Sequence, residues 1–392
     1  MINDFHAYQA KTTPHPIGME VKKAKGSYIT DMQGKKYLDF VAGVSACSLG
    51  HRHPAVVKAI RRQINRYLHV MVYGEYAQAP AVELCKLLAQ QLPKSLEVTY
   101  LTNSGTEAIE GAMKLAKRVT GRKEIIAAQN AYHGSTQGAL SLLGVEEQKK
   151  GYDPLLPEVR FIPFNDQEAL SNITTATAAV VLETIQGGAG FIVPENNYLT
   201  AVKKRCEATG TLLILDEIQP GIGRTGKLFA FEHYQITPDI LVIGKGLGGG
   251  MPIGAFCSSS EKMEQLTHNP ALGHITTFGG NPVIAAAGLA TLSTVIKKKL
   301  MGQIEQKEML FRSLLIHPKI TAIHGKGLLL APILKNKEEV PKVVKRCMDK
   351  GLILFFLLWE KRAIRISPPL TITHREIKKG CAILISVLDE LE

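Results

Sequence analysis

Short apolar runs alternate with helix-like segments through the middle of the chain, and this alternation is the feature that most limits the possible folds. The runs are apolar nearly throughout, as expected for strands that helices cover on both faces of a sheet. We predict six such strands: Val98–Leu101, Glu124–Ala128, Val159–Ile162, Ala178–Leu182, Leu212–Asp216 and Ile240–Ile243. Segments with helical patterns lie between them, for example Glu107–Val119 and Leu199–Ala208. This order predicts an α/β domain with a mainly parallel sheet.

The two ends of the chain have a different character. Residues Val21–Phe40 predict a hairpin-like pair of strands whose turn is Asp31-Met32-Gln33-Gly34. A long alanine-rich helix is predicted after Pro282, and a helix from Arg375 is predicted to end a mixed α/β tail. We therefore expect an N-terminal segment (residues 1–45) that packs with the smaller domain, a large domain (residues 46–284) and a small C-terminal domain (residues 285–392).

Length and charge narrow the expected partners. The chain has 392 residues, of which 45% are hydrophobic and 21% are charged, as in ordinary globular proteins with a sizeable core. The formal net charge of +12 can indicate binding to nucleic acid or to a membrane. However, the longest basic runs, such as Lys297–Lys299, have only three residues, and no RNA- or DNA-binding motif accompanies them. We therefore expect neither nucleic acid nor a membrane as a partner.

Cysteine usage and targeting signals indicate a cytoplasmic protein. The six cysteines are scattered with no C-x-x-C pair, so neither a zinc site nor a dithiol redox motif is predicted. The N-terminal residues lack the apolar core of a signal peptide. The longest apolar run, Leu352–Trp359, is too short to cross a bilayer, and we interpret it as a buried strand.

Three of the predicted strands end in polar residues that we expect to meet at one edge of the sheet, because ligands of open α/β sheets bind at the carboxyl ends of the strands. The first strand leads into Thr102–Thr106, which opens a helix whose free N–H groups and hydroxyls suit a phosphate. The strand at Leu212 delivers Asp216, whose buried carboxylate needs a partner such as a pyridinium N–H. The strand at Ile240 delivers Lys245, and a desolvated lysine is nucleophilic enough for Schiff-base chemistry.

Each of these features also has a plain structural explanation. Ser104 or Gly105 could be an ordinary helix N-cap, Asp216 could pair with an arginine or a helix N-terminus, and Lys245 could be a solvated charge. Their combination on three strands of one sheet instead favours a single phosphorylated pyridine cofactor. The segment Gly221–Gly226 matches the dinucleotide pattern G-x-G-x-x-G, but it does not follow a strand directly, and no acidic residue stands about 20 positions later after a second strand. We therefore do not interpret that segment as a nucleotide site.

Longer motifs around these residues resemble those of the class III, or ω-amino, aminotransferases, a family that includes acetylornithine, ornithine and 4-aminobutyrate aminotransferases. The resemblance is carried by LDEIQPGIGRTG at 215–226, KGLGGGMPIG at 245–254, and by YLDF at 37–40, LGH at 49–51, NSGTEA at 103–108, TFGGNP at 277–282 and RISPPL at 365–370. It implies a pyridoxal-phosphate-dependent transferase of fold type I, with a large domain on a mainly parallel seven-stranded sheet and a smaller α/β domain. It also implies a homodimer with each active site at the interface between subunits.

The same resemblance assigns roles to individual residues. Lys245 would form the Schiff base and act as general acid and base, and Asp216 would pair with the pyridine nitrogen. The other cofactor-binding residues would be Ser104, Gly105 and Thr106 at the phosphate, Tyr132 and His133 beside the ring, Glu183, Gln219 at the ring hydroxyl, and Thr277 reaching the phosphate from the partner subunit. Substrate would be bound by Arg365 at its α-carboxylate, and by Tyr73, Ser135 and Gly188. His51 and His53 resemble a metal pair, but the family has a similar histidine without a metal, so we expect no metal site.

Two positions depart from the family's motifs and bear on the substrate. The family usually reads E-P-x-Q-G-E-G-G, and here Gly188 replaces the second glutamate, which pairs with and hides the carboxylate-binding arginine. It also usually reads F-H-G-R-T, and here Ser135 replaces the arginine that commonly holds the distal carboxylate. Losing such a charge-assisted hydrogen bond costs roughly 1.5–3 kcal/mol, on the order of ten- to a hundredfold in affinity. We hypothesise an ω-amino or amine donor that is not an acid held at both ends, as 4-aminobutyrate and acetylornithine are. An amine, a diamine or another amino acid with a largely apolar tail fits this description.

Two other functions fit the same motifs. An aminomutase or racemase on this scaffold would need no external 2-oxo acid, and it would rearrange or racemise an amino acid without an acceptor. A non-catalytic protein that only binds pyridoxal phosphate would not need the complete set of Lys245, Asp216 and the phosphate-binding helix. The complete set favours an aminotransferase that passes the amino group to a 2-oxo acid such as 2-oxoglutarate or pyruvate.

Overall fold

The computed structural model describes residues 1–391. Its α-helices are α1 (Ile2–Tyr8), α2 (Ala42–Ser45), α3 (Pro54–Ile64), α4 (Ala79–Gln91), α5 (Gly105–Thr120), α6 (Gln137–Ser141), α7 (Tyr198–Thr209), α8 (Ser260–Glu264), α9 (Pro282–Lys297), α10 (Ile304–Leu314), α11 (Glu339–Asp349) and α12 (His374–Asp389). Short 3₁₀ helices are η1 (Lys94–Leu96), η2 (Glu146–Lys149), η3 (Glu168–Asn172), η4 (Ala230–Tyr234), η5 (Lys245–Gly248) and η6 (Leu300–Gln303). None of the helices in this part of the chain combines the length and apolar character needed to span a membrane.

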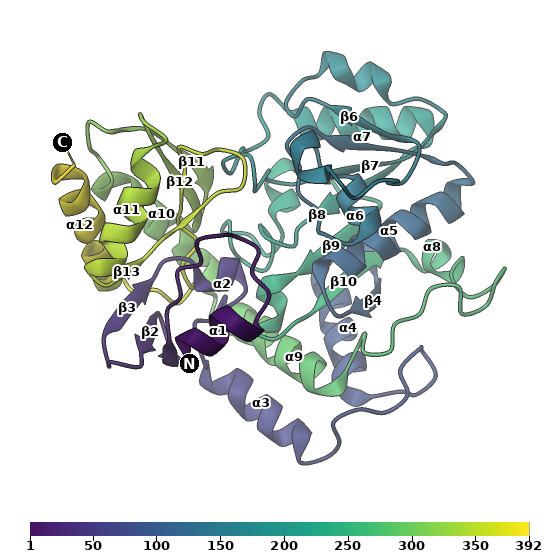
Figure 1. The fold of residues 1–392 in the computed structure, drawn as a ribbon. Coiled ribbons are helices and arrows are strands. Elements are labelled where there is room, and N and C mark those ends of the chain that lie inside the picture. Colours follow the sequence, from purple (N-terminus) through teal and green to yellow (C-terminus); the bar gives the residue numbers. More distant parts are fainter. Residues whose placement is uncertain (392) are drawn as a thin grey trace.

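A seven-stranded sheet organises the larger region, on the right of Figure 1. Its strands, in spatial order, are β4 (Val98–Thr102), β10 (Gly254–Ser258), β9 (Ile240–Gly244), β8 (Leu212–Asp216), β7 (Thr177–Glu183), β5 (Glu124–Ala128) and β6 (Val159–Ile162). Only β10 runs antiparallel to its neighbours, so the predicted mainly parallel seven-stranded sheet is confirmed. The six predicted strands all form within one residue of their predicted ends, whereas β10 was not predicted.

Helices cover both faces of this sheet, and the alternation of side chains along each strand explains why. In β8, Leu213 and Leu215 join one buried cluster, while Leu212 and Ile214 join a second cluster on the opposite face. Helix α5 packs against β7, β9 and β10 on the second face. Burial on both faces is the physical reason why these strands are apolar nearly throughout.

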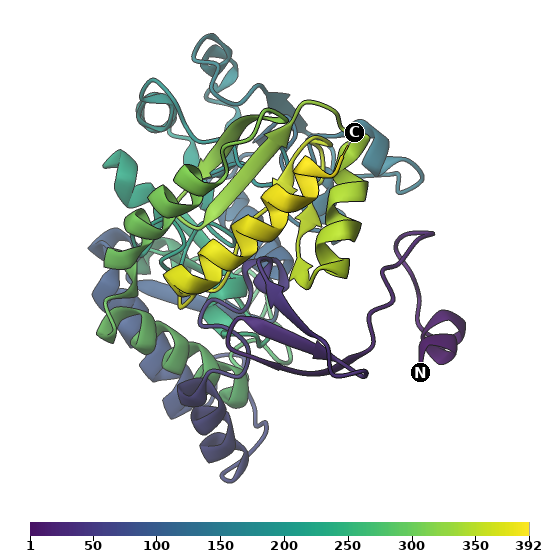
Figure 2. The ribbon, with the colours of Figure 1, turned by 90° about the vertical axis from the view of Figure 1, so that its left-hand side faces the viewer.

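Segments from the N-terminal and C-terminal parts of the chain together form the smaller region, which lies on the left of Figure 1 and faces the viewer in Figure 2. The predicted hairpin forms as β1 (Val21–Lys25), β2 (Tyr28–Asp31) and β3 (Lys36–Asp39), and β3 pairs in parallel with β13 (Leu352–Ile353). A separate hairpin joins β11 (Ile320–Lys326) to β12 (Leu329–Leu334). The alanine-rich helix α9 continues across residue 285, where the sequence places the start of the second domain, so that boundary stays a prediction.

The interpretation of Leu352–Trp359 as one buried strand is wrong. The run forms two short strands, β13 and β14 (Phe355–Phe356), and β14 pairs with β15 (Ile364–Arg365) instead of continuing beside β3. Phe355, Phe356 and Leu358 remain 38–47% exposed. Hydrophobicity alone does not distinguish an apolar segment that fills a core from one that lines a cavity, and here the second case holds for part of the run.

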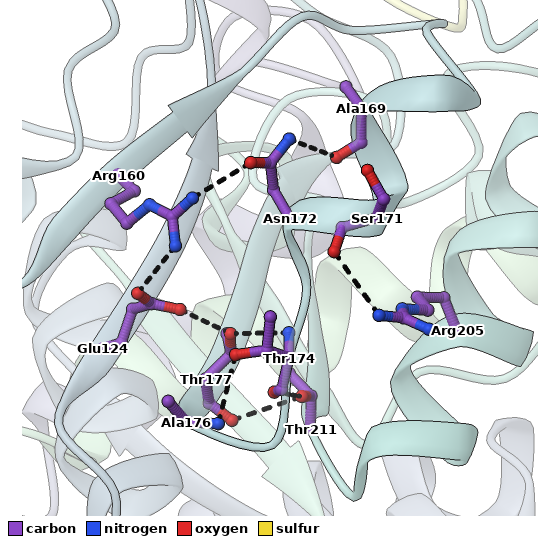
Figure 3. Close-up of polar contacts among 10 residues, drawn as sticks. All are labelled: Glu124, Arg160, Ala169, Ser171, Asn172, Thr174, Ala176, Thr177, Arg205 and Thr211. Atoms are coloured by element: carbon purple, nitrogen blue, oxygen red, sulfur yellow. Dashed lines mark hydrogen bonds and ion pairs between the residues drawn. The ribbon is translucent and has the colours of Figure 1, made fainter.

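Figure 3 shows a network of polar side chains that joins β5, β6 and β7 at the amino ends of these strands. Glu124 at the start of β5 accepts hydrogen bonds from Arg160 of β6, at 3.0 Å, and from the hydroxyl of Thr177 at the start of β7. Arg160 also donates to Asn172, at 3.0 Å. This network lies at the edge of the sheet opposite to the carboxyl ends of the strands, where ligands of such sheets bind.

Candidate active site

A cavity of about 450 Å³ opens at the carboxyl ends of five strands of the large sheet. It brings together most of the residues predicted from the sequence: Gly105, Thr106, Tyr132, His133, Ser135, Glu183, Gly188, Asp216, Gln219, Lys245 and Arg365. These residues follow β4, β5, β7, β8 and β9, except for Arg365 of β15, which comes from the smaller region. The cavity therefore lies between the two regions, where side chains from both can act on one ligand.

The N-terminus of α5 points two free N–H groups toward this cavity. Ser104 is the N-cap, and its hydroxyl accepts a hydrogen bond from the N–H of Glu107 at 3.3 Å. The first turn leaves the N–H groups of Gly105 and Thr106 without helical partners. A Cβ at position 105 would lie 2.6 Å from the Ile218 side chain, so a larger residue there would require Ile218 to shift. A 16-residue helix with such an N-terminus is suited to bind a phosphate.

Asp216 is buried at the end of β8 and is already paired on one side. Its Oδ2 atom lies 2.8 Å from Nδ1 of the buried His133, and its Oδ1 atom accepts a hydrogen bond from the N–H of Ile218 at 2.9 Å. Burial lowers the pKa of His133, but the hydrogen bond and charge of Asp216 outweigh burial and raise that pKa above its ordinary value. Asp216 is thereby held in position in the lining of the cavity, where its carboxylate oxygens can accept a further hydrogen bond from a ring N–H.

Lys245 and Glu183 both line the cavity, and burial shifts the pKa of each toward neutrality. Burial lowers the pKa of Lys245, with a further contribution from the charge of Arg365. Burial raises the pKa of Glu183 to about 7, although its oxygens accept hydrogen bonds from the N–H groups of Gly187 and Tyr132. Lys245 also has a positive φ of 36°, and such strain in a non-glycine residue is typical of functional sites.

Arg365 is a buried cation that has only neutral partners among the described residues. Its Nη1 donates to Oε1 of Gln219 at 2.6 Å, its Nε donates to the carbonyl of Phe356 at 3.3 Å, and its guanidinium lies 5.4 Å from the centre of the Phe191 ring. Burial lowers its pKa to about 10, which leaves it charged at neutral pH. A ligand carboxylate is the partner that this guanidinium lacks.

Comparisons with known proteins agree with this geometry. A family model described as Aminotransferase class-III matches residues 8–388. The chain belongs to the class III aminotransferases. An acetylornithine aminotransferase from Caldanaerobacter subterraneus subsp. tengcongensis is 39% identical over 381 residues, which cover 94% of each chain. That of Mycobacterium leprae is 40% identical over 373 residues, which cover 93% of this chain and 89% of that one.

Solved structures share the fold of this class III aminotransferase. The ornithine aminotransferase of Toxoplasma gondii ME49 is 30% identical and superimposes with a TM-score of 0.91, over 100% of this chain and 96% of that chain. A second structure of that enzyme, 31% identical with a TM-score of 0.91 over 100% and 95% of the two chains, has PLP at partial occupancy in its active site. Class III aminotransferases use pyridoxal phosphate, so the chain is a pyridoxal-phosphate-dependent aminotransferase.

The residues of the cavity fit this cofactor. The free N–H groups of α5 suit its phosphate, the carboxylate of Asp216 suits its ring nitrogen, and Lys245 lines the same cavity. Nε2 of His133 is buried without a partner among residues 1–391, so the protein alone does not complete this polar cluster. Within the same residues, no group of three His, Cys, Asp or Glu side chains is arranged to hold a metal ion.

Three predicted residues lie outside the cavity of the single chain, and others were missed. Ser104 is the N-cap of α5 and does not line the cavity. Thr277 is exposed and Tyr73 is half-buried, and each lies in a segment without helix or strand. The missed lining residues are Gly134 and six residues with apolar side chains: Val44, Ile218, Pro220, Phe355, Phe356 and Leu358. Val44 has a φ of 57°, which is rare for a β-branched residue, and no sequence pattern marks it.

Proposed function

We propose that this aminotransferase takes its amino group from a donor with an apolar tail and passes it to a 2-oxo acid such as 2-oxoglutarate or pyruvate. The observation that supports this proposal is the composition of the cavity outside the cofactor site. There the lining of the cavity includes the apolar side chains of Val44, Phe355, Phe356 and Leu358. Ser135, which also lines the cavity, is an exposed neutral side chain that is hydrogen-bonded to Tyr132 at 3.2 Å. This outer part therefore suits a donor whose tail carries no second carboxylate.

The residues would share the work as follows. Pyridoxal phosphate, when bound, supplies an electron sink that acidifies the C–H bond beside the transferred nitrogen. Gly105 and Thr106 would hold its phosphate and Asp216 its ring nitrogen. Lys245 would hold the cofactor and then carry a proton, because an amine whose pKa is lowered by burial can accept one near neutral pH. Arg365 would fix a substrate carboxylate so that the reacting carbon stays beside Lys245.

A donor and acceptor panel tests this proposal. We expect apolar-tailed donors to reduce the cofactor's visible absorbance in single turnovers, and 2-oxoglutarate or pyruvate to restore it. Acetylornithine as the preferred donor by a wide margin would contradict the proposal. A parallel mixture without a 2-oxo acid is the control for a racemase or aminomutase, because those activities would convert the amino acid without an acceptor.

We also propose that the enzyme is a homodimer in which Thr277 reaches the phosphate of the partner subunit's cofactor. Two irregular segments, residues 65–78 and 266–281, lie against each other through a hydrogen bond from Asn281 to the carbonyl of Leu68 at 3.1 Å. They carry six apolar side chains that are 46–62% exposed in the single chain: Leu68, Met71, Tyr76, Leu272, Ile275 and Phe278. Such a cluster of exposed apolar side chains is typical of a protein interface, and a second copy of this chain would cover it.

A further inference from the structure

The half-buried indole of Trp359 packs directly against the backbone of Gly188 at the edge of the cavity. A Cβ built at position 188 would lie 2.6 Å from Nε1 and 3.0 Å from Cδ1 of Trp359. The backbone N–H of Trp359 also donates to the carbonyl of Gly188 at 2.9 Å, which holds the two segments together. Any side chain at position 188, including one with a carboxylate, would therefore require the indole of Trp359 to shift.

This contact matters because of what lies beside Gly188. The preceding residue in the chain, Gly187, faces the amide of Gln219, and that amide accepts the 2.6 Å hydrogen bond from Arg365. Gly188 and Arg365 line the same cavity. The two carboxylates that line the cavity are already engaged, Asp216 with His133 and Glu183 with two backbone N–H groups. The charge of Glu183 raises the pKa of Arg365, but Arg365 forms no direct ion pair among the residues that the structure describes.

We infer that Trp359 is a specificity-determining residue that keeps Arg365 open for a substrate carboxylate in both half-reactions. The donor must then be an α-amino acid with an apolar side chain, and neither an amine, a diamine nor an ω-amino acid. This inference rests on the proposed function and selects one of the donor classes that it allows. The α-carboxylate binds Arg365, the amino carbon faces Lys245, and the side chain lies on the wall formed by Phe355, Phe356 and Leu358.

The physical reason is the cost of covering an unpaired guanidinium. An amine bound in the cavity would shield Arg365 from water without providing a counter-charge, whereas an α-carboxylate forms two charge-assisted hydrogen bonds with it. The difference corresponds to about a hundredfold or more in the rate of the first half-reaction at low donor concentration. An ω-amino acid brings a carboxylate, but it would place that charge on the apolar wall.

Matched donors test the inference on the wild-type holoenzyme. Norleucine, n-pentylamine and 6-aminohexanoate have similar tails and differ in where the carboxylate stands. We expect norleucine to discharge the cofactor's visible absorbance about a hundredfold faster than either of the others. Pentylamine or 6-aminohexanoate reacting as fast as norleucine overturns the inference while leaving the proposed function intact. If none of the apolar-tailed donors reacts, the proposed function itself fails.

Paired variants test the role of Trp359. In Gly188→Glu/Trp359→Ala, room for the glutamate exists and its carboxylate can neutralise Arg365, whereas Gly188→Gln/Trp359→Ala has the same shape without the charge. We expect the glutamate variant to reduce the preference for norleucine over pentylamine at least tenfold relative to the glutamine variant. Equal preferences in the two variants overturn the inference.

Equilibrium binding provides a readout that does not depend on turnover. Hexanoate is norleucine without its amino group, and hexanamide is its neutral control. By calorimetry with the holoenzyme, we expect hexanoate to bind the wild type at least tenfold more tightly than hexanamide, and the glutamate variant to lose this difference. Equal affinities of the wild-type enzyme for hexanoate and hexanamide would contradict the inference that Arg365 is open to a carboxylate. This measurement on the wild type remains decisive if the double variants do not fold.

Discussion

Replacing Asp216 with asparagine tests the centre of the candidate site. The substitution keeps the size of the side chain and removes its charge. Oδ1 of the asparagine can still accept the 2.9 Å hydrogen bond from Ile218, but its amide nitrogen would replace the oxygen that lies 2.8 Å from Nδ1 of His133. Because burial lowers the pKa of His133 once the charge of Asp216 is gone, we expect His133 to become neutral and accept a hydrogen bond from the new amide.

The structure sets the size of the effect. Asp216 is only 3% exposed, so solvent screens its interactions little. Loss of the charge-assisted hydrogen bond to the ring nitrogen costs roughly 1.5–3 kcal/mol, which weakens cofactor binding about 10- to 100-fold. The cost to the protein without cofactor stays near 1–3 kcal/mol, because His133 can lose its proton instead of remaining as an unpaired buried charge.

The pH dependence of this loss has a definite sign. Asp216 raises the pKa of His133 above the unfolded value of 6.5, so the pair stabilises the fold fully below that pH and less as the pH rises through the raised pKa. We therefore expect the free energy of unfolding in urea to differ more between wild type and Asp216→Asn at about pH 6 than at about pH 9.

Titration of the apoenzyme with pyridoxal phosphate measures the cofactor affinity. Asp239→Asn is the matched control, because Asp239 also accepts hydrogen bonds from a backbone N–H, that of Leu213 at 2.9 Å, and from a cation, Lys203 at 3.0 Å. Asp239 lies at the amino end of β9, away from the cavity. The Asp239→Asn variant should therefore lower the stability of the fold without weakening cofactor binding. A cofactor affinity of Asp216→Asn within twofold of wild type would refute the assignment of Asp216 to the ring nitrogen.

Three further predictions address other parts of the molecule. Lys245→Ala should abolish turnover and the visible absorbance of the protein-linked cofactor while keeping the melting temperature, and an unchanged visible spectrum would contradict the role of Lys245. Thr277→Ala should weaken cofactor binding, and mixed dimers with Lys245→Ala should regain activity because one of their two sites would be complete; no recovery after subunit exchange would argue against Thr277 acting across the interface. Glu124→Ala should lower the free energy of unfolding by about 1–2 kcal/mol, mainly through the lost bond to Thr177, because Arg160 is half exposed and its pair with Glu124 contributes little. Its kcat should be unchanged, and a large loss of kcat would show that the network in Figure 3 is coupled to the cavity.

The sequence predicted the six parallel strands well because each is buried on both faces and therefore apolar nearly throughout. The same rule failed for β10, whose sequence Gly-Ala-Phe-Cys-Ser is short and rich in small residues. Gly254, its first residue, lies where a Cβ would be 2.0 Å from the carbonyl of Ser104, so the composition of β10 reflects its close packing against the start of α5. Such a packing constraint cannot be predicted from the strand propensity of the residues.

The ends of the strands were also predictable, because polar residues that follow apolar strands of a parallel sheet share one edge. This placed Asp216, Lys245 and the start of α5 together before any coordinates were considered, and the structure brings all three to one cavity. Pairing within the cavity was not predictable. The contact between His133 and Asp216 joins residues 83 positions apart, and neither side chain by itself specifies the other as its partner.

Strand alternation, strand-end chemistry and the family's motifs, all properties of the sequence, determined the α/β fold and the candidate chemistry at Lys245. Tertiary structure alone decided what surrounds that chemistry. The sequence shows glycine at position 188 and an apolar run at Leu352–Trp359, but only the folded chain brings the indole of Trp359 against Gly188 and turns the Phe355 and Phe356 side chains toward the cavity. The reason is physical: hydrophobicity is a property of one residue, whereas the space beside Arg365 depends on which distant segments pack together.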